Sequence, residues 1–127
     1  MNNTMEQVGD DYLEAKVLQE NSEPHVVYVT SQDDPAVFVG EVLREIAVRN
    51  RNFKLVQVDA YAVTFAETYQ VLSIPTTFIF KRGKLVTTLG GFVPADLIEE
   101  VIEKETRPKS VDMLLDELKH QREATEG

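Results

Sequence analysis

Hydrophobic residues in this chain alternate between the spacing of helices and that of strands. The run 26–30 is apolar and rich in β-branched side chains, which is typical of a strand buried on both faces. The residues after it predict a helix that begins at Pro35 and ends near Asn50, and the run 53–58 predicts a second buried strand. The stripe that this helix would bury consists of Val39, Val42, Leu43 and Ile46.

Two further helices are indicated by capping-box spacings. The opening residues are polar, and we expect no regular structure there. Asp11 with Glu14 predicts a helix that ends before Pro24, and Thr64 with Glu67 predicts another in the middle of the chain. The apolar faces of these two helices are Leu13 with Val17, and Phe65 with Tyr69 and Leu72.

After Pro75 the pattern changes to that of a β-hairpin. The runs 76–80 and 85–89 are separated by a polar turn centred on Gly83, so we expect an antiparallel pair within a mixed sheet. Pro94 then marks the start of a helix that completes the α/β unit. The apolar face of that helix consists of Leu97, Ile98, Val101 and Ile102.

The order of elements predicts one α/β domain over residues 1–105 and a C-terminal extension over residues 106–127. Within the extension, Ser110 can cap a helix that ends near Gln121. So short a helix is marginal alone in water, so its apolar face should dock on its own domain, on a partner protein or on a second copy. That face consists of Val111, Leu114, Leu115 and Leu118.

Composition excludes several classes of function. The chain has 127 residues, 22 acidic and 13 basic, and its formal net charge of −9 disfavours binding to nucleic acids and anionic membranes. No apolar run approaches the roughly 20 residues that span a bilayer, and residues 1–23 lack the pattern of a secretory signal, so we expect a cytoplasmic location. The absence of cysteine excludes disulfides, thiolate nucleophiles and thiolate metal sites.

Several local motifs together resemble those of the thioredoxin family, over roughly residues 10–104. They are SIPT at 73–76, the hairpin TTFIFKRGK at 76–84, LREIA at 43–47, VQVDA at 56–60 and GGF at 90–92. The resemblance implies a thioredoxin-like fold, a central mixed β-sheet flanked by helices, to which this chain adds the C-terminal helix. It also implies a cis peptide bond before Pro75.

The departures from the family pattern carry the functional expectation. Thioredoxins have the motif WCGPC where the first long strand meets its helix, and the matching positions of its two cysteines here are Asp34 and Ala36, in a loop one residue shorter. The buried aspartate and lysine that assist thiol exchange in the family correspond to Tyr28 and Leu55. We therefore expect no thiol–disulfide exchange, no catalytic residue and no cofactor.

Two groups of residues remain as candidates for binding. One is the helical face of the extension, and the other is a groove between the altered loop and the turn before the hairpin. The groove residues are Asp33, Asp34, Pro35, Ala36, Ser73, Ile74, Pro75 and Thr76.

Each candidate has a purely structural alternative. The turn at Pro75 could simply be retained by the fold, and Asp33 and Asp34 fit helix caps better than an acid–base pair or metal ligands. His25 and His120 lie in separate elements without ligand spacing, so we expect both to face solvent and expect no metal site.

Two hypotheses for function follow. The first is a redox-inactive thioredoxin-like protein, not an enzyme, that binds protein partners as an adaptor, co-chaperone or assembly factor and can self-associate through its C-terminal helix. The alternative is a glutathione-type small-ligand binding protein, or a transferase-like enzyme, that uses the hydroxyl groups of Tyr28, Thr30 or Ser31 near Pro75. The large helical domain that completes such transferases is absent from this sequence.

Overall fold

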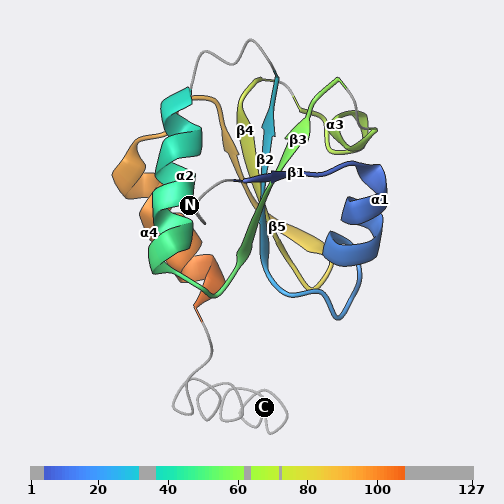
Figure 1. Cartoon of the computed structure of the whole chain (residues 1–127), viewed down its shortest axis with the longest axis horizontal. Helices are drawn as coiled ribbons and strands as arrows, with labels where there is room; N and C mark the ends of the chain where they lie inside the picture. The colour runs from blue at the N-terminus through green and yellow to red at the C-terminus, as the bar shows by residue number, and fades with distance from the viewer. Residues whose placement is uncertain (1–4, 32–36, 62–63, 72, 108–127) are drawn as a thin grey trace, which may run out of the picture.

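A five-stranded mixed sheet with helices on both faces makes up the fold of the computed structural model (Figure 1). The structure describes residues 5–31, 37–61, 64–71 and 73–107. The strands are β1 (Glu6–Gln7), β2 (His25–Thr30), β3 (Lys54–Asp59), β4 (Thr76–Lys81) and β5 (Lys84–Gly90). The helices are α1 (Asp10–Tyr12), its π-helical continuation η1 (Leu13–Val17), α2 (Val37–Arg49), α3 (Phe65–Thr68) and α4 (Ala95–Thr106).

The strand order is β1-β3-β2-β4-β5. β2 runs parallel to β3 and antiparallel to β4, so Val27 lies between Val56 on one side and Phe78 on the other. β1 is parallel to β3, and β5 is antiparallel to β4. The α/β fold with a central mixed sheet, predicted from the sequence, is therefore confirmed.

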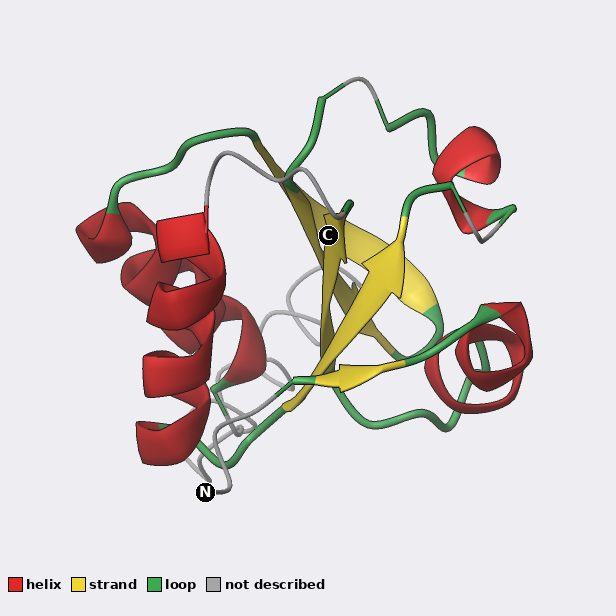
Figure 2. Ribbon diagram, turned by 45° about the horizontal axis from the view of Figure 1, so that its top comes forward, coloured by secondary structure: helices red, strands yellow, loops and turns green. Residues whose placement is uncertain are grey.

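The helices form two layers, with α2 and α4 on one face of the sheet and α1, η1 and α3 on the other (Figure 2). All six residues of β2 are buried, which confirms the predicted central strand. Its Val26 and Tyr28 face the α2–α4 layer, whereas Val27 and Val29 pack with η1. The α2–α4 core also contains Val39, Leu43, Ile46, Ile79, Ile98 and Ile102, and the η1 core contains Leu13, Val17, Val56, Val58, Phe78 and Phe80.

β3 is less buried than the sequence predicts. Only Val56 and Val58 of this strand are buried, while Lys54 is exposed. The reason is its position, because on its outer side β3 pairs only with the two residues Glu6 and Gln7 of β1. The expectation that the opening residues have no regular structure is also wrong for these two residues.

The start of one predicted helix differs from its capping-box prediction at Asp11, whereas α3 begins directly after Thr64, as predicted. α1 begins after Gly9 without a side-chain cap, and the Asp10 carboxylate instead accepts hydrogen bonds from the backbone N–H of Thr64, at 3.0 and 3.1 Å. The helix expected to continue to Leu72 ends at Thr68, because Gln70 adopts a left-handed conformation with φ of 53°. Leu72 itself lies outside the described residues.

The predicted hairpin is confirmed, with Arg82 and Gly83 as its two-residue turn. Both residues have positive φ, 53° and 80°, as a type I′ turn requires. The turn packs against the end of the N-terminal helix, since a Cβ on Gly83 would lie 2.8 Å from the carbonyl oxygens of Leu18 and Gln19. The hairpin turn therefore packs closely against the backbone that directly follows η1.

α4 follows Pro94, as predicted, and buries Ile98 and Ile102. The prediction that Leu97 belongs to the buried face is wrong, because this side chain is 43% exposed. None of the helices in the described ranges has the length and apolar character needed to cross a membrane. The predicted C-terminal helix, with Ser110 and its apolar face, lies outside the described residues.

Candidate functional site

The turn before β4 is fixed by two hydrogen bonds. The Ile74–Pro75 peptide bond is cis. The hydroxyl of Thr76 donates to the carbonyl of Ser73 at 2.6 Å, and the backbone N–H of Gly91 donates to the carbonyl of Pro75 at 2.7 Å. Pro75 and Thr76 are buried, Ile74 is half-buried and Ser73 is exposed. The end of β5 is thus tied directly to the cis-proline turn.

Two exposed phenylalanines lie at this end of the sheet. Phe92 follows Gly91, and its ring stacks on that of Phe38 in the first turn of α2, with ring centroids 5.9 Å apart and planes inclined by 17°. Phe38 is 41% exposed and Phe92 is 64% exposed. Figure 1 shows the start of α2 and the connection from β5 to α4 at the same end of the sheet. We call this pair the aromatic platform.

The structure brings together only part of the predicted groove. Asp33, Asp34, Pro35 and Ala36 lie outside the described residues, and the four residues 73–76 form the turn described above. The aromatic platform was not predicted. Phe38 lies off the buried stripe of its helix and Phe92 stands in the motif GGF, so the sequence offers only one signal, an aromatic side chain at a position that the core does not need.

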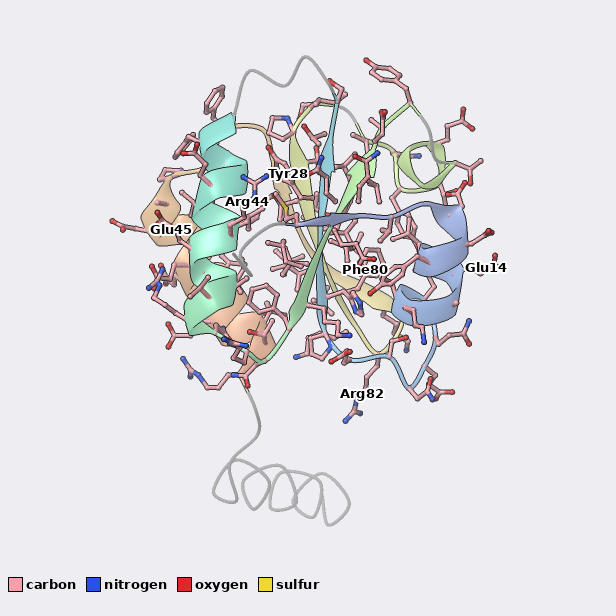
Figure 3. All side chains as sticks on the ribbon, in the orientation of Figure 1. Glu14, Tyr28, Arg44, Glu45, Phe80 and Arg82 are labelled. Carbon is pink, nitrogen blue, oxygen red and sulfur yellow. The ribbon has the colours of Figure 1, made fainter. Side chains whose placement is uncertain are left out.

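Tyr28 and Leu55 occupy positions where the family has charged groups, and here both contribute to packing. Tyr28 is 3% exposed and lies on the α2 side of the sheet (Figure 3). A Cβ on Gly40 would lie 3.3 Å from the Tyr28 ring and 3.3 Å from the methyl group of Met5, so the glycine makes room for the ring. Leu55 is partly buried against the same core.

Burial limits the access of a small ligand to the hydroxyl groups of Tyr28 and Thr30, on which the alternative hypothesis relies in part. Tyr28 and Thr30 are 3% and 6% exposed, and the Thr30 hydroxyl donates to the carbonyl of Ser31 at 3.3 Å. Of the three residues, Ser31 alone is more than marginally accessible. A small ligand at this position would have to rely on Ser31.

The prediction that His25 faces solvent is wrong, because the residue is 1% exposed at the start of the central strand. Its Nδ1 lies 2.9 Å from the carbonyl oxygen of Glu23, and its Nε2 lies 3.1 Å from the hydroxyl oxygen of Tyr12. Since a carbonyl only accepts, Nδ1 carries the proton and Nε2 accepts from Tyr12. Burial lowers the pKa of His25 and raises that of Tyr12. His120 lies outside the described residues.

No candidate metal centre is found in the part of the chain that the structure describes. Within it, no cluster of three or more histidine, aspartate or glutamate side chains could hold a metal ion. Every buried polar side-chain atom there has a hydrogen-bond partner. The aromatic platform is an accessible apolar feature at the cis-proline end.

Sequence comparison identifies thioredoxins as relatives of this chain. A thioredoxin from Mycoplasmoides gallisepticum is 26% identical over 88 residues, which cover 68% of this chain and 88% of that protein. A thioredoxin from Staphylococcus saprophyticus is 37% identical over 73 residues, or 55% of this chain and 69% of that protein. No protein-family model matches the chain.

Two solved structures with the same fold are also thioredoxins. Thioredoxin O2 from Arabidopsis thaliana in its oxidized state superposes with a TM-score of 0.72 at 18% identity, covering 84% of this chain and 98% of that one. A mutant thioredoxin from Halobacterium salinarum gives a TM-score of 0.68 at 17% identity, covering 83% and 95%. These two structures support the likeness in fold.

Proposed function

The chain belongs to the thioredoxin family, and we propose that it is a redox-inactive member that binds other proteins as an adaptor, co-chaperone or assembly factor. Without cysteine it has no thiol with which to exchange disulfides. A scaffold that lacks its family's reactive group must act through another site, since function resides in sites and not in folds. The observation that carries the proposal is the aromatic platform at the cis-proline end.

The platform has the properties of a protein-binding hot spot. Phe38 and Phe92 stack on one another while remaining 41% and 64% exposed. Aromatic side chains are enriched among the residues that dominate binding energy, and exposed apolar patches commonly mark interaction sites. Burying a fully exposed large apolar side chain contributes about 1.5–3 kcal/mol. Phe38 and Phe92, which are partly exposed, can each contribute a fraction of that when a partner covers them.

The platform is also held rigidly. Phe92 is adjacent to Gly91, whose backbone is bonded to Pro75, and Phe38 precedes the buried Val39 on α2. Both rings therefore project from backbone that the core fixes. A preorganised surface loses less conformational entropy on binding. Since both exposed rings are apolar, the partner we propose is an apolar or aromatic segment of another protein.

Substitution of the platform tests the proposal. The full chain, the double variant Phe38→Ser with Phe92→Ser, and the control Val86→Ser would be immobilised, and proteins from the source cells captured and identified. Val86 is 43% exposed on β5 near the hairpin turn, so it matches Phe38 in exposure but not in position. By calorimetry, the captured partner should bind the control normally and the double variant at least about tenfold more weakly, or about 1.4 kcal/mol. Equal affinity for all three proteins would contradict the proposal.

The small-ligand alternative has a separate readout. Glutathione added to the labelled full chain should leave its amide resonances unchanged. Shifts confined to Ser31, Thr76 and their neighbours would support the alternative instead.

A further inference from the structure

The end of the sheet opposite the aromatic platform carries a groove rich in cations. β2 and β3 begin at this end, after Pro24 and Phe53, and β4 ends there at Lys81. Two cavities, of about 500 and 560 Å³, share Asn52 and Arg107. We call them together the cationic groove. The basic side chains that line it are Arg49, Arg51, Lys81, Arg82 and Arg107.

The charge of the groove is only partly compensated. Glu99 pairs with Arg49 at 2.6 Å and Glu103 with Arg107 at 3.6 Å, but these pairs are 45–62% exposed and hence weak. The other three basic residues, Arg51, Lys81 and Arg82, make no ion pair with any residue that the structure describes. Figure 3 shows Arg82 extending away from the sheet. Glu105 also lines the groove, so five basic side chains lie there with three acidic ones, and the groove keeps an excess of positive charge in a chain of net charge −9.

The chain leaves its described part at this same groove. Arg107 lines both cavities, and Val111 follows four residues later. Four residues of extended chain span at most roughly 14 Å, so the segment 111–118 starts beside the groove. A short tether of this kind gives an effective concentration in the millimolar range, so that even a weak attraction populates the bound state.

We propose that residues 111–118 of the same chain occupy the cationic groove. The segment carries Asp112, Asp116 and Glu117 and no basic residue, which complements the uncompensated cations. Its apolar residues Val111, Leu114, Leu115 and Leu118 need a surface, and Pro24 with the aliphatic stems of Lys81 and Arg82 provides one. The inference is independent of the proposed function, because the platform lies at the other end of the sheet.

The absence of cysteine makes a paramagnetic test direct. A nitroxide would be attached to the full chain at Lys119→Cys, and the broadening of backbone amide resonances measured. The amides of Asn52 and Arg82 should be broadened, and those of Phe38 and Phe92 should not. In the variant Asp112→Lys with Asp116→Lys, broadening at Asn52 and Arg82 should fall at least about threefold, because the charge attraction is reversed.

Groove variants complete the test. Arg51→Glu with Arg82→Glu should reduce the broadening of Asn52 as the tail variant does, whereas Lys16→Glu with Arg44→Glu, cations outside the groove, should not. A chain that carries both the groove substitutions and the tail substitutions should recover the broadening of the Asn52 amide, because the charges are again opposite. An unchanged core resonance at Leu43 would show that each variant is folded.

Three results would overturn the proposal. Equal broadening in native and charge-reversed chains would indicate a free tether that visits the groove only through its attachment. Broadening at Phe38 and Phe92 would place the tail on the platform. Broadening of an isotope-labelled chain by a separate spin-labelled one would indicate a second copy as the occupant.

Discussion

His25 is held in its neutral form by burial at the start of the central strand, where its ring nitrogens lie within hydrogen-bond distance of the Tyr12 hydroxyl and the Glu23 carbonyl. Lys54 also disfavours the charged form, whereas the Glu23 carbonyl and carboxylate favour it less strongly than burial opposes it. The pKa of His25 in the folded chain is therefore below the value of about 6.5 expected in the unfolded chain. This difference links protonation to stability.

Lowering the pH should destabilise the fold through this residue. Below about pH 6.5 the unfolded chain takes up a proton that folded His25 does not, so the free energy of unfolding falls until folded His25 titrates in turn. His25→Gln should remove this part of the pH dependence, and His120→Gln should leave it in place. Urea denaturation at about pH 7.5 and 5.5 measures both, and an unaltered pH dependence in His25→Gln would show that another group is responsible.

Tyr28 offers a second prediction at the residue scale. Tyr28→Asp would leave a cavity and an unpaired carboxyl group beside Val39 and Ile79 in the α2–α4 core. The expected loss in the free energy of unfolding is about 3–5 kcal/mol. Tyr61→Asp, at a tyrosine that is 83% exposed, should change it by less than about 0.5 kcal/mol. Similar losses in the two variants would mean that Tyr28 does not support the core.

The β4–β5 turn leaves no room for a side chain at Gly83. Gly83→Ala adds a Cβ at a residue with φ of 80°, 2.8 Å from the carbonyl oxygens of Leu18 and Gln19. The left-handed conformation alone costs about 1–2 kcal/mol, and the collision with backbone adds to this. Gly90→Ala, whose nearest contact would be 3.5 Å from the Ser73 hydroxyl, is the matched control. Thermal and urea denaturation should separate the two variants, and equal stability would refute the contact with the backbone that follows η1.

The elements that the sequence predicts well are those whose local pattern and tertiary setting agree. The stripe of α2, the uninterrupted apolar run of β2 and the Arg82–Gly83 turn each carry a strong local signal. The misjudged elements depend on distant partners. β3 is only partly buried because β1 pairs with only two of its residues. The two residues of β1 are too few to show a hydrophobic periodicity.

The candidate site was less predictable than the fold. The turn at Ser73 to Thr76 was expected from its motif, but the stacking of Phe38 on Phe92 joins residues far apart in the chain. The spacing of residues within one helix or strand does not predict a contact between two side chains so far apart in the sequence. The burial of His25 was missed for a related reason, since its partner Tyr12 comes from a separate helix.

For the molecule as a whole, the absence of sulfur nucleophiles predicts a clear biochemical result. The purified chain should not accelerate the reduction of insulin disulfides, because no thiolate is available to form the mixed disulfide. In the presence of a reductant, turbidity should rise at the same rate with and without the purified chain. A sample with additional dithiothreitol, in which turbidity rises faster, serves as the positive control. Acceleration that rises in proportion to this chain would contradict the assignment as redox-inactive.

The aromatic platform and the cationic groove lie at opposite ends of the same sheet, since β4 begins at the first and ends at the second. An occupant of one end therefore leaves the other end open. Roughly 20 Å of rigid strand separates them, at about 3.4 Å per residue. If both proposals hold, a partner at the platform and the C-terminal segment in the groove are kept at a set distance from one another, and neither attachment uses a thiol.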